Sequence, residues 1–93
     1  MNVRKISWQV ENLLKKLSLP FEKYISSTNS HYFTLYTNSE NCEIRVSDHG
    51  QVYGNPTYCI DDTDDGETYS FVKKQLIILA KKEKDWNIAN GNI

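Results

Sequence analysis

The first part of the chain carries apolar residues at the spacing of an α-helix. Ser7 is a suitable N-cap for this helix, because its hydroxyl can accept a hydrogen bond from a free backbone N–H. Pro20 should end the helix, since a proline disfavours the α conformation of the residue before it. The residues that share one side, at i, i+3, i+4 and i+7, are Val10, Leu13, Leu14 and Leu17.

The middle of the chain alternates apolar and polar residues, which is typical of β-strands. Tyr32–Thr37 and Cys42–Ser47 both alternate, and the polar residues Asn38–Asn41 between them predict a β-hairpin. We expect one further short strand at Phe21–Ser26 and another at Thr57–Ile60. Successive side chains of a strand point to opposite faces of the sheet, so every second residue of these runs should face a core.

A second helix is predicted from about Glu67 to Lys84, and the residues 85–93 after it, which contain two Gly/Asn breakers, are expected to fray. The element order is α-β-β-β-(β)-α. This order predicts one α+β domain over residues 1–93, with two helices on one face of a small antiparallel sheet of three to four strands. The apolar stripe of the second helix comprises Val72, Leu76, Leu79 and Ala80, broadened by Phe71 and Ile78.

Length and composition restrict the functions to be considered. A chain of 93 residues makes one domain with a thin core, which fits a small nuclease, a toxin or a binding module better than a multi-substrate enzyme. No apolar run approaches the ~18–20 residues of a membrane span, and the N-terminal residues lack the apolar stretch of a signal peptide. We therefore expect a cytoplasmic protein without a membrane partner. Cys42 and Cys59 form no C-x-x-C pair and are expected to be free, buried thiols.

The net charge of −1 hides an uneven distribution along the chain. Basic residues dominate the predicted helices at both ends, and acidic residues dominate 61–67. Two basic helices could offer a surface to phosphates, and one acidic loop could offer a surface to a basic protein. The lysines expected to form the basic surface of the second helix are Lys73, Lys74, Lys81 and Lys82.

Two groups of polar residues lie at strand positions where folding alone does not demand them. Arg45 supplies a planar cation suited to phosphate or carboxylate, and Asp48 could orient His49 as a general acid or base. In the alternative interpretation Arg45 and Asp48 form a structural ion pair, and the serines build a turn around Asn29. The first polar group is Ser26, Ser27, Ser30 and His31; the second polar group is Arg45, Ser47, Asp48 and His49.

Other candidate sites are weaker. The acidic run 61–67 lacks the glutamate that ends an EF-hand loop, because Val72 stands at that position, and helix capping explains its carboxylates better. The set Cys42, Cys59, His31 and His49 matches no zinc spacing, and nothing in the spacing pairs Cys59 with His49 as in a cysteine protease. We therefore expect no metal ion and no cofactor.

The aromatic residues allow two interpretations. Tyrosines on a sheet can stack on the bases of single-stranded nucleic acid, but more often they straddle the edge of a core with the hydroxyl in water, and we favour the second role for most of the six. Trp8 and Trp86 are expected to be packing residues.

The two polar groups are part of a longer pattern: Tyr24-Ile25-Ser26-Ser27, then Ser30-x-Tyr32, then Glu43-Ile44-Arg45-Val46-Ser47-Asp48-His49. This pattern, about 26 residues of the 93, resembles small phage and mobile-element proteins, including a family of broad-spectrum phage anti-CRISPR proteins that inhibits Cas9. The resemblance implies an anti-defence inhibitor acting in the bacterial host cell, with a Cas effector protein, its guide RNA, or both as partner. The binding residues it implies are Ser26, Ser27, Ser30, Tyr32, Arg45, Ser47, Asp48 and His49.

The chain departs from that family in one respect. The anti-CRISPR family carries a long basic N-terminal arm, whereas here only Arg4 and Lys5 precede the first predicted helix. Two other functions fit the same residues. In a small nucleic-acid-cleaving toxin, Arg45 would stabilise the phosphorane charge, and His49 or His31 would move protons. The third function is that of a dimeric antitoxin or regulatory DNA-binding protein.

Overall fold

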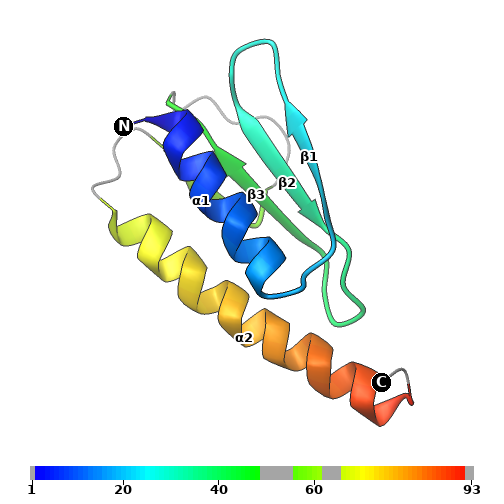
Figure 1. Cartoon of the computed structure of the whole chain (residues 1–93). Helices are drawn as coiled ribbons and strands as arrows, with labels where there is room; N and C mark the ends of the chain where they lie inside the picture. Colours follow the sequence, from blue (N-terminus) through cyan, green and yellow to red (C-terminus); the bar gives the residue numbers. More distant parts are fainter. Residues whose placement is uncertain (1, 49–55, 62–65, 92–93) are drawn as a thin grey trace.

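A computed structural model describes residues 2–48, 56–61 and 66–91 of the chain. It confirms the α+β class predicted from the sequence (Figure 1). In chain order the elements are α1 (Val3–Lys16), β1 (Phe21–Ile25), β2 (His31–Leu35), β3 (Cys42–Val46), β4 (Tyr58–Ile60) and α2 (Glu67–Ala89).

The described strands form one sheet in the order β1-β2-β3-β4. The first two pairs are antiparallel, and in the second of them Tyr32 lies opposite Arg45. β4 instead runs parallel to β3, with Ile44 opposite Tyr58. The sheet is therefore mixed, whereas the prediction was a fully antiparallel sheet. Alternation of apolar and polar residues is the same in both kinds of pairing, and therefore it could not reveal the direction of β4.

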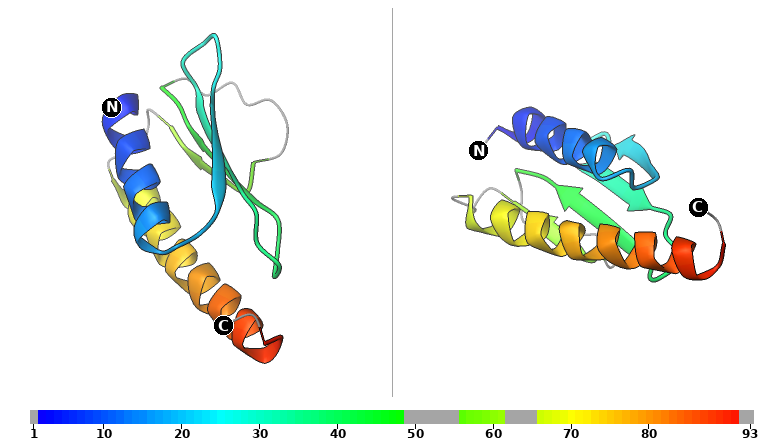
Figure 2. Two further views of the ribbon diagram at one scale, coloured as in Figure 1. Left: turned by 45° about the vertical axis from the view of Figure 1, so that its right-hand side comes forward. Right: turned by 60° about the horizontal axis from the view of Figure 1, so that its bottom comes forward.

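The two helices and one face of the sheet enclose a single core. α1 packs on β2 and β3, α2 packs on β4, and the helices lie side by side and run in the same general direction (Figure 2). Phe33, Ile44 and Val46 point toward the helices and are fully buried. Because side chains alternate along a strand, Tyr32 and Arg45 point to the sheet face opposite the helices.

α1 begins earlier than predicted. Its N-cap is Asn2, whose Oδ1 accepts a hydrogen bond from the backbone N–H of Lys5 at 3.1 Å. Ser7, predicted to be the cap, is a buried residue inside the helix, and Arg4 and Lys5 belong to α1 instead of preceding it. A serine hydroxyl can cap a helix or bond across a core, and the sequence pattern does not distinguish these uses.

α2 continues to Ala89, so the prediction that the chain frays from residue 85 is wrong for most of that segment. The helix ends where Asn90 Nδ2 donates to the carbonyl oxygen of Trp86 and Gly91 adopts a φ of 71°. Phe71 and Ile78, predicted to broaden the buried stripe, are about half exposed. None of the described helices is long and apolar enough to cross a membrane.

Glu83 is a charged residue on the buried, otherwise apolar side of α2. It follows Leu79 by four residues, which puts it on the buried side of α2, and it is only 8% exposed. Its Oε2 accepts a hydrogen bond from the backbone N–H of Asn38 at 2.8 Å, and its Oε1 accepts one from Asn38 Nδ2 at 2.7 Å. The carboxylate therefore fastens the turn between β2 and β3 to the second helix.

Candidate functional site

The two polar groups meet where β2 begins and β3 ends. The register places Ser30, just before β2, beside Ser47, just after β3. The Ser30 hydroxyl donates to Ser47 Oγ at 3.2 Å, and Nη2 of Arg45 donates to the same oxygen at 3.1 Å. Three of the predicted binding residues thus form one hydrogen-bonded cluster, which we call the arginine cluster.

The arginine cluster lies in the interior. Arg45 and Ser30 are each 1% exposed, and Ser47 has no exposed surface. A residue that binds a partner at the surface must be exposed, and these three predicted binding residues are not, because alternation along a strand fixes the direction of a side chain but not what covers that face. Besides these two hydrogen bonds, a further interaction is made by each of Ser30, Arg45, Ser47 and Asp48.

The serines of the first polar group build the β1–β2 turn. Ser26 Oγ accepts a hydrogen bond from the backbone N–H of Ser30 at 3.0 Å, and the backbone N–H of Ser26 donates to the Ser30 carbonyl at 2.9 Å. Asn29 has a φ of 63°, in the left-handed region that asparagine tolerates better than most residues. This agrees with the turn interpretation for Ser26 and Asn29, and it leaves Ser27 exposed at the tip of the hairpin.

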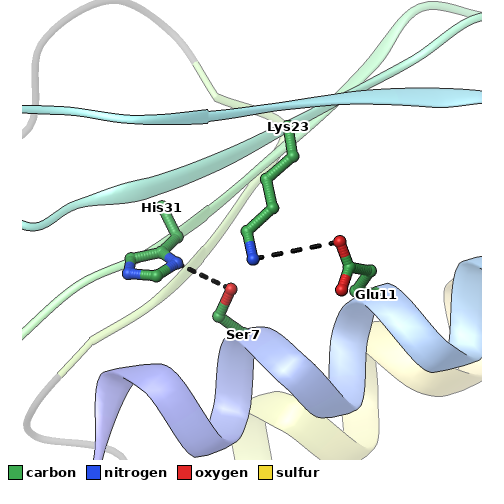
Figure 3. Close-up of polar contacts among 4 residues, drawn as sticks. All are labelled: Ser7, Glu11, Lys23 and His31. Atoms are coloured by element: carbon green, nitrogen blue, oxygen red, sulfur yellow. Dashed lines mark hydrogen bonds and ion pairs between the residues drawn. The ribbon is translucent and has the colours of Figure 1, made fainter.

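His31 is buried between α1 and the sheet and is not part of the arginine cluster. Its Nδ1 lies 2.7 Å from Ser7 Oγ (Figure 3), and its Nε2 lies 3.2 Å from Asn29 Oδ1. Desolvation by burial lowers the pKa of His31, and the positive charges of Lys23 and Arg4 lower this pKa further. In its neutral form, the His31 ring donates its Nε2–H to Asn29 Oδ1 and accepts a hydrogen bond from the Ser7 hydroxyl at Nδ1.

The contacts link a hydroxyl, an imidazole and an amide, as in the catalytic triads of some hydrolases, but the surroundings of Ser7, His31 and Asn29 do not suit catalysis. Ser7 is 1% exposed and faces the sheet, so its hydroxyl is closed to a substrate. The ion pair between Lys23 and Glu11, 3.9 Å apart, lies near this contact in Figure 3 and also joins α1 to the sheet. The geometry is that of a docking contact between helix and sheet.

Two tyrosines of the pattern lie on the sheet face opposite the helices. Tyr24 is well exposed and Tyr32 is half-buried, and their ring centroids are 6.2 Å apart across the β1–β2 pair. Asp48 is exposed after the end of β3. His49, the base of the toxin hypothesis, lies outside the described residues.

The described part of the chain gives little support to the hypotheses of a cysteine nucleophile or a metal site. Cys42 is a buried free thiol and Cys59 a half-buried one, and burial raises the pKa of Cys42. Among the described residues, no three His, Cys, Asp or Glu side chains are grouped closely enough to hold a metal ion. Most of the acidic run that we compared with a calcium loop, residues 62–65, lies outside the described residues.

The lysines of α2 divide into two sets. Lys73 lines a groove of about 270 Å³ between the helices, together with Lys16 of α1. Lys16 also lines a neighbouring groove of about 490 Å³, with Lys81 and Lys84. The structure therefore brings Lys73 and Lys81 together with two lysines that the prediction left out. We call the set Lys16, Lys73, Lys81 and Lys84 the lysine surface.

The two grooves are not lined by Lys74 or Lys82, which were predicted to belong to the same basic surface. Each follows a member of the lysine surface by one residue, which turns it about 100° around the helix axis. Lys74 lines a separate depression beside Glu67 and Phe71. Lys74 precedes Lys81 by seven residues and so lies on nearly the same side of α2, which means that helix phase alone does not separate the two sets. The signal is the position of α1, which determines where along α2 the two grooves form.

No family model, no curated protein and no solved structure matches the chain.

Proposed function

We propose that the protein is a non-enzymatic inhibitor carried by a phage or other mobile element, and that it binds a Cas effector through the guide RNA in the bacterial cytoplasm. The observation that carries the proposal is the lysine surface. Its members converge on two adjacent grooves at the junction of α1 and α2. Among the described residues that line these grooves, the one carboxylate, Glu83, is already bound to Asn38. Such a surface attracts a phosphate backbone.

The resemblance to phage proteins supplies the kind of partner, and the structure supplies a physical reason for the shared pattern. Ser30, Arg45 and Ser47 join the ends of β2 and β3 by hydrogen bonds. A sequence that keeps these residues keeps this junction, so the pattern favours a common fold, and a common role has to be argued from the exposed residues. Several described residues of the pattern have surface to offer a partner: Tyr24, Ile25, Ser27 and Asp48 are exposed, and Tyr32 is half-buried.

The toxin alternative receives less support. A catalytic arginine must reach the scissile phosphate, and a guanidinium that is 1% exposed does not reach a nucleic-acid backbone. His31 is held by Ser7 and Asn29 in the interior, away from any substrate. The positions of Arg45 and His31 therefore favour a binding protein, and the other candidate base, His49, lies outside the described residues.

The test is inhibition of DNA cleavage by a guide-loaded Cas9 in the presence of two matched variants. The first variant changes all four residues of the lysine surface to glutamine. The control changes four exposed lysines outside it to glutamine, with the same loss of charge: Lys5, Lys15, Lys74 and Lys82.

We expect the first variant to need about tenfold more protein or more for half-inhibition, and the control to inhibit like the wild type. Circular dichroism must show that both variants melt cooperatively. Equal inhibition by both variants would show that the lysine surface has no specific role in inhibition. A wild-type protein that leaves cleavage unchanged at saturating concentration would overturn the proposed function for this effector class.

A further inference from the structure

Trp8 is not the packing residue predicted from the sequence. Its side chain is 62% exposed on α1, although an indole is among the most costly groups to leave in water. It lines the smaller of the two grooves between α1 and α2, across from Tyr69. An exposed aromatic ring at the rim of a groove is typical of a binding site.

The other residues of this groove have complementary chemistry. Gln9 and Asn12 bring amide groups that can donate and accept hydrogen bonds, and Lys16 and Lys73 bring positive charge. None of the described residues that line the groove is acidic. Stacking ring, amides and cations are the three kinds of group with which proteins hold an unpaired base and its phosphates.

We propose that this groove binds one unpaired base of single-stranded RNA, stacked on Trp8, with the adjacent phosphates on Lys16 and Lys73. The inference rests on the proposed function and names the part of the guide RNA that is recognised. The volume of about 270 Å³ lies just below that of sites for drug-sized ligands, which suits a single base. A base inside a duplex is covered on both faces by its neighbours, so a duplex would not offer a face to Trp8.

The path of the strand follows from the second groove. Lys16 borders both grooves, and the second groove continues along α2 to Lys81 and Lys84. Lys73 and Lys84 are about 16 Å apart along the helix axis at 1.5 Å per residue. With about 3.4 Å per stacked nucleotide, this length accommodates about five nucleotides. A strand whose base occupies the Trp8 groove can therefore lay its next phosphates along the rest of the lysine surface.

The experiment measures binding of the full chain to a fluorescein-labelled RNA of about ten nucleotides, single-stranded or annealed to its complement, by fluorescence anisotropy at low salt. The variants are W8A and W8F, with the control I88A, which removes an exposed apolar side chain of α2 outside the groove. In a W86F background, RNA binding is also followed by quenching of Trp8 fluorescence. Trp8 is exposed, so W8A should fold, and its thermal melt checks this.

We expect single-stranded RNA to bind more tightly than the duplex and to quench Trp8. We also expect W8A to weaken single-strand binding between about fivefold and a hundredfold, W8F to keep most of it, and I88A to leave it unchanged. Unchanged binding by W8A, while the lysine variant loses affinity, would overturn the Trp8 site and leave the proposed function standing.

A different set of results would keep the Trp8 site and overturn the proposed function. These results are quenching and a W8A defect with free RNA, together with no inhibition of Cas9. Anionic phosphatidylglycerol vesicles are a third probe, because lysines and an indole also suit a membrane surface. Binding to vesicles that W8A abolishes, with no quenching by RNA, would assign the groove to lipid and overturn the inference.

Discussion

Ser7 Oγ in α1 lies 2.7 Å from Nδ1 of His31 in β2, and both side chains are buried. This contact crosses the interface between helix and sheet, near the ion pair of Lys23 and Glu11. A buried polar group that loses its partner costs about 1–3 kcal/mol. The two residues therefore fix how α1 sits on the sheet as well as contributing to stability.

The first prediction concerns Ser7→Ala. This substitution removes the hydroxyl and leaves Nδ1 of His31 buried without its partner, so we expect the free energy of unfolding to fall by about 1–3 kcal/mol. Urea denaturation followed by circular dichroism measures the change. Ser70→Ala, at an exposed serine of α2, is the matched control and should change stability by less than about 0.5 kcal/mol. Equal effects of the two substitutions would show that the contact contributes nothing.

The second prediction is a loss of stability in mild acid. The pKa of His31 in the folded protein is below its ordinary value of 6.5, so between these two pKa values the unfolded chain binds more protons than the folded chain. The contribution of His31 to the free energy of unfolding is therefore fully present above about pH 6.5, and it is lost as the pH falls toward the pKa of His31 in the folded protein. Urea denaturation at about pH 7.5 and about pH 5.5 should show this decrease.

Two variants assign the pH dependence to its source. His31→Gln should be less stable than the wild type near neutral pH but should show a flatter pH dependence, because the titrating group is gone. His49→Gln should keep the slope of the wild type. A slope that disappears in the His49 variant and persists in the His31 variant would contradict the assignment.

The elements of this fold follow from short-range patterns, and their assembly does not. Alternation predicted the hairpin of β2 and β3, because the period of two is local to each strand. The parallel pairing of β4 depends on where the chain returns to the sheet, which no local period encodes. The prediction ended α2 near Lys84 because residues 85–93 contain Gly/Asn breakers, whereas the helix continues to Ala89 and Asn90 is its C-cap.

The candidate site shows the same limit. The sequence identified the residues of the arginine cluster as unusual, and the structure joins Ser30 to Ser47 by a hydrogen bond. Their burial depends on what covers the sheet face, which a single strand does not specify. Trp8 and Lys16 were missed as site residues because each becomes notable only when α2 lies beside α1. Charge counts along the chain predicted basic helices, and only the packing of the two helices selects which lysines act together.

The third prediction concerns Glu83, which binds the turn between β2 and β3. Glu83→Ala removes two charge-assisted hydrogen bonds to Asn38 and should lower the free energy of unfolding by about 2 kcal/mol or more. The backbone N–H of Asn38 should also exchange its hydrogen faster, as measured by NMR hydrogen exchange. Asp85→Ala, two residues farther along α2 and exposed, is the control and should leave both quantities nearly unchanged. Unaltered exchange at Asn38 in the Glu83 variant would contradict this role.

The fourth prediction distinguishes a structural role of Arg45 from a role in binding. An exposed binding arginine could be replaced without loss of stability, but Arg45 is 1% exposed and donates to Ser47 in the interior. We therefore expect Arg45→Ala to lower the free energy of unfolding by about 3 kcal/mol or more, a large part of the stability of a small domain. Arg45→Lys should recover only part of this loss, because an ammonium group cannot reproduce the planar fork of the guanidinium.

The decisive measurement combines stability with function. Inhibition of Cas9 cleavage is compared at a temperature at which the Arg45 variants are still folded, as judged by circular dichroism. If Arg45 acts only through the fold, the folded Arg45→Lys variant inhibits like the wild type, and its defect appears only when it unfolds. A variant that is fully folded yet inactive would mean that the guanidinium contacts the partner, and the arginine cluster would then have to open to bind it.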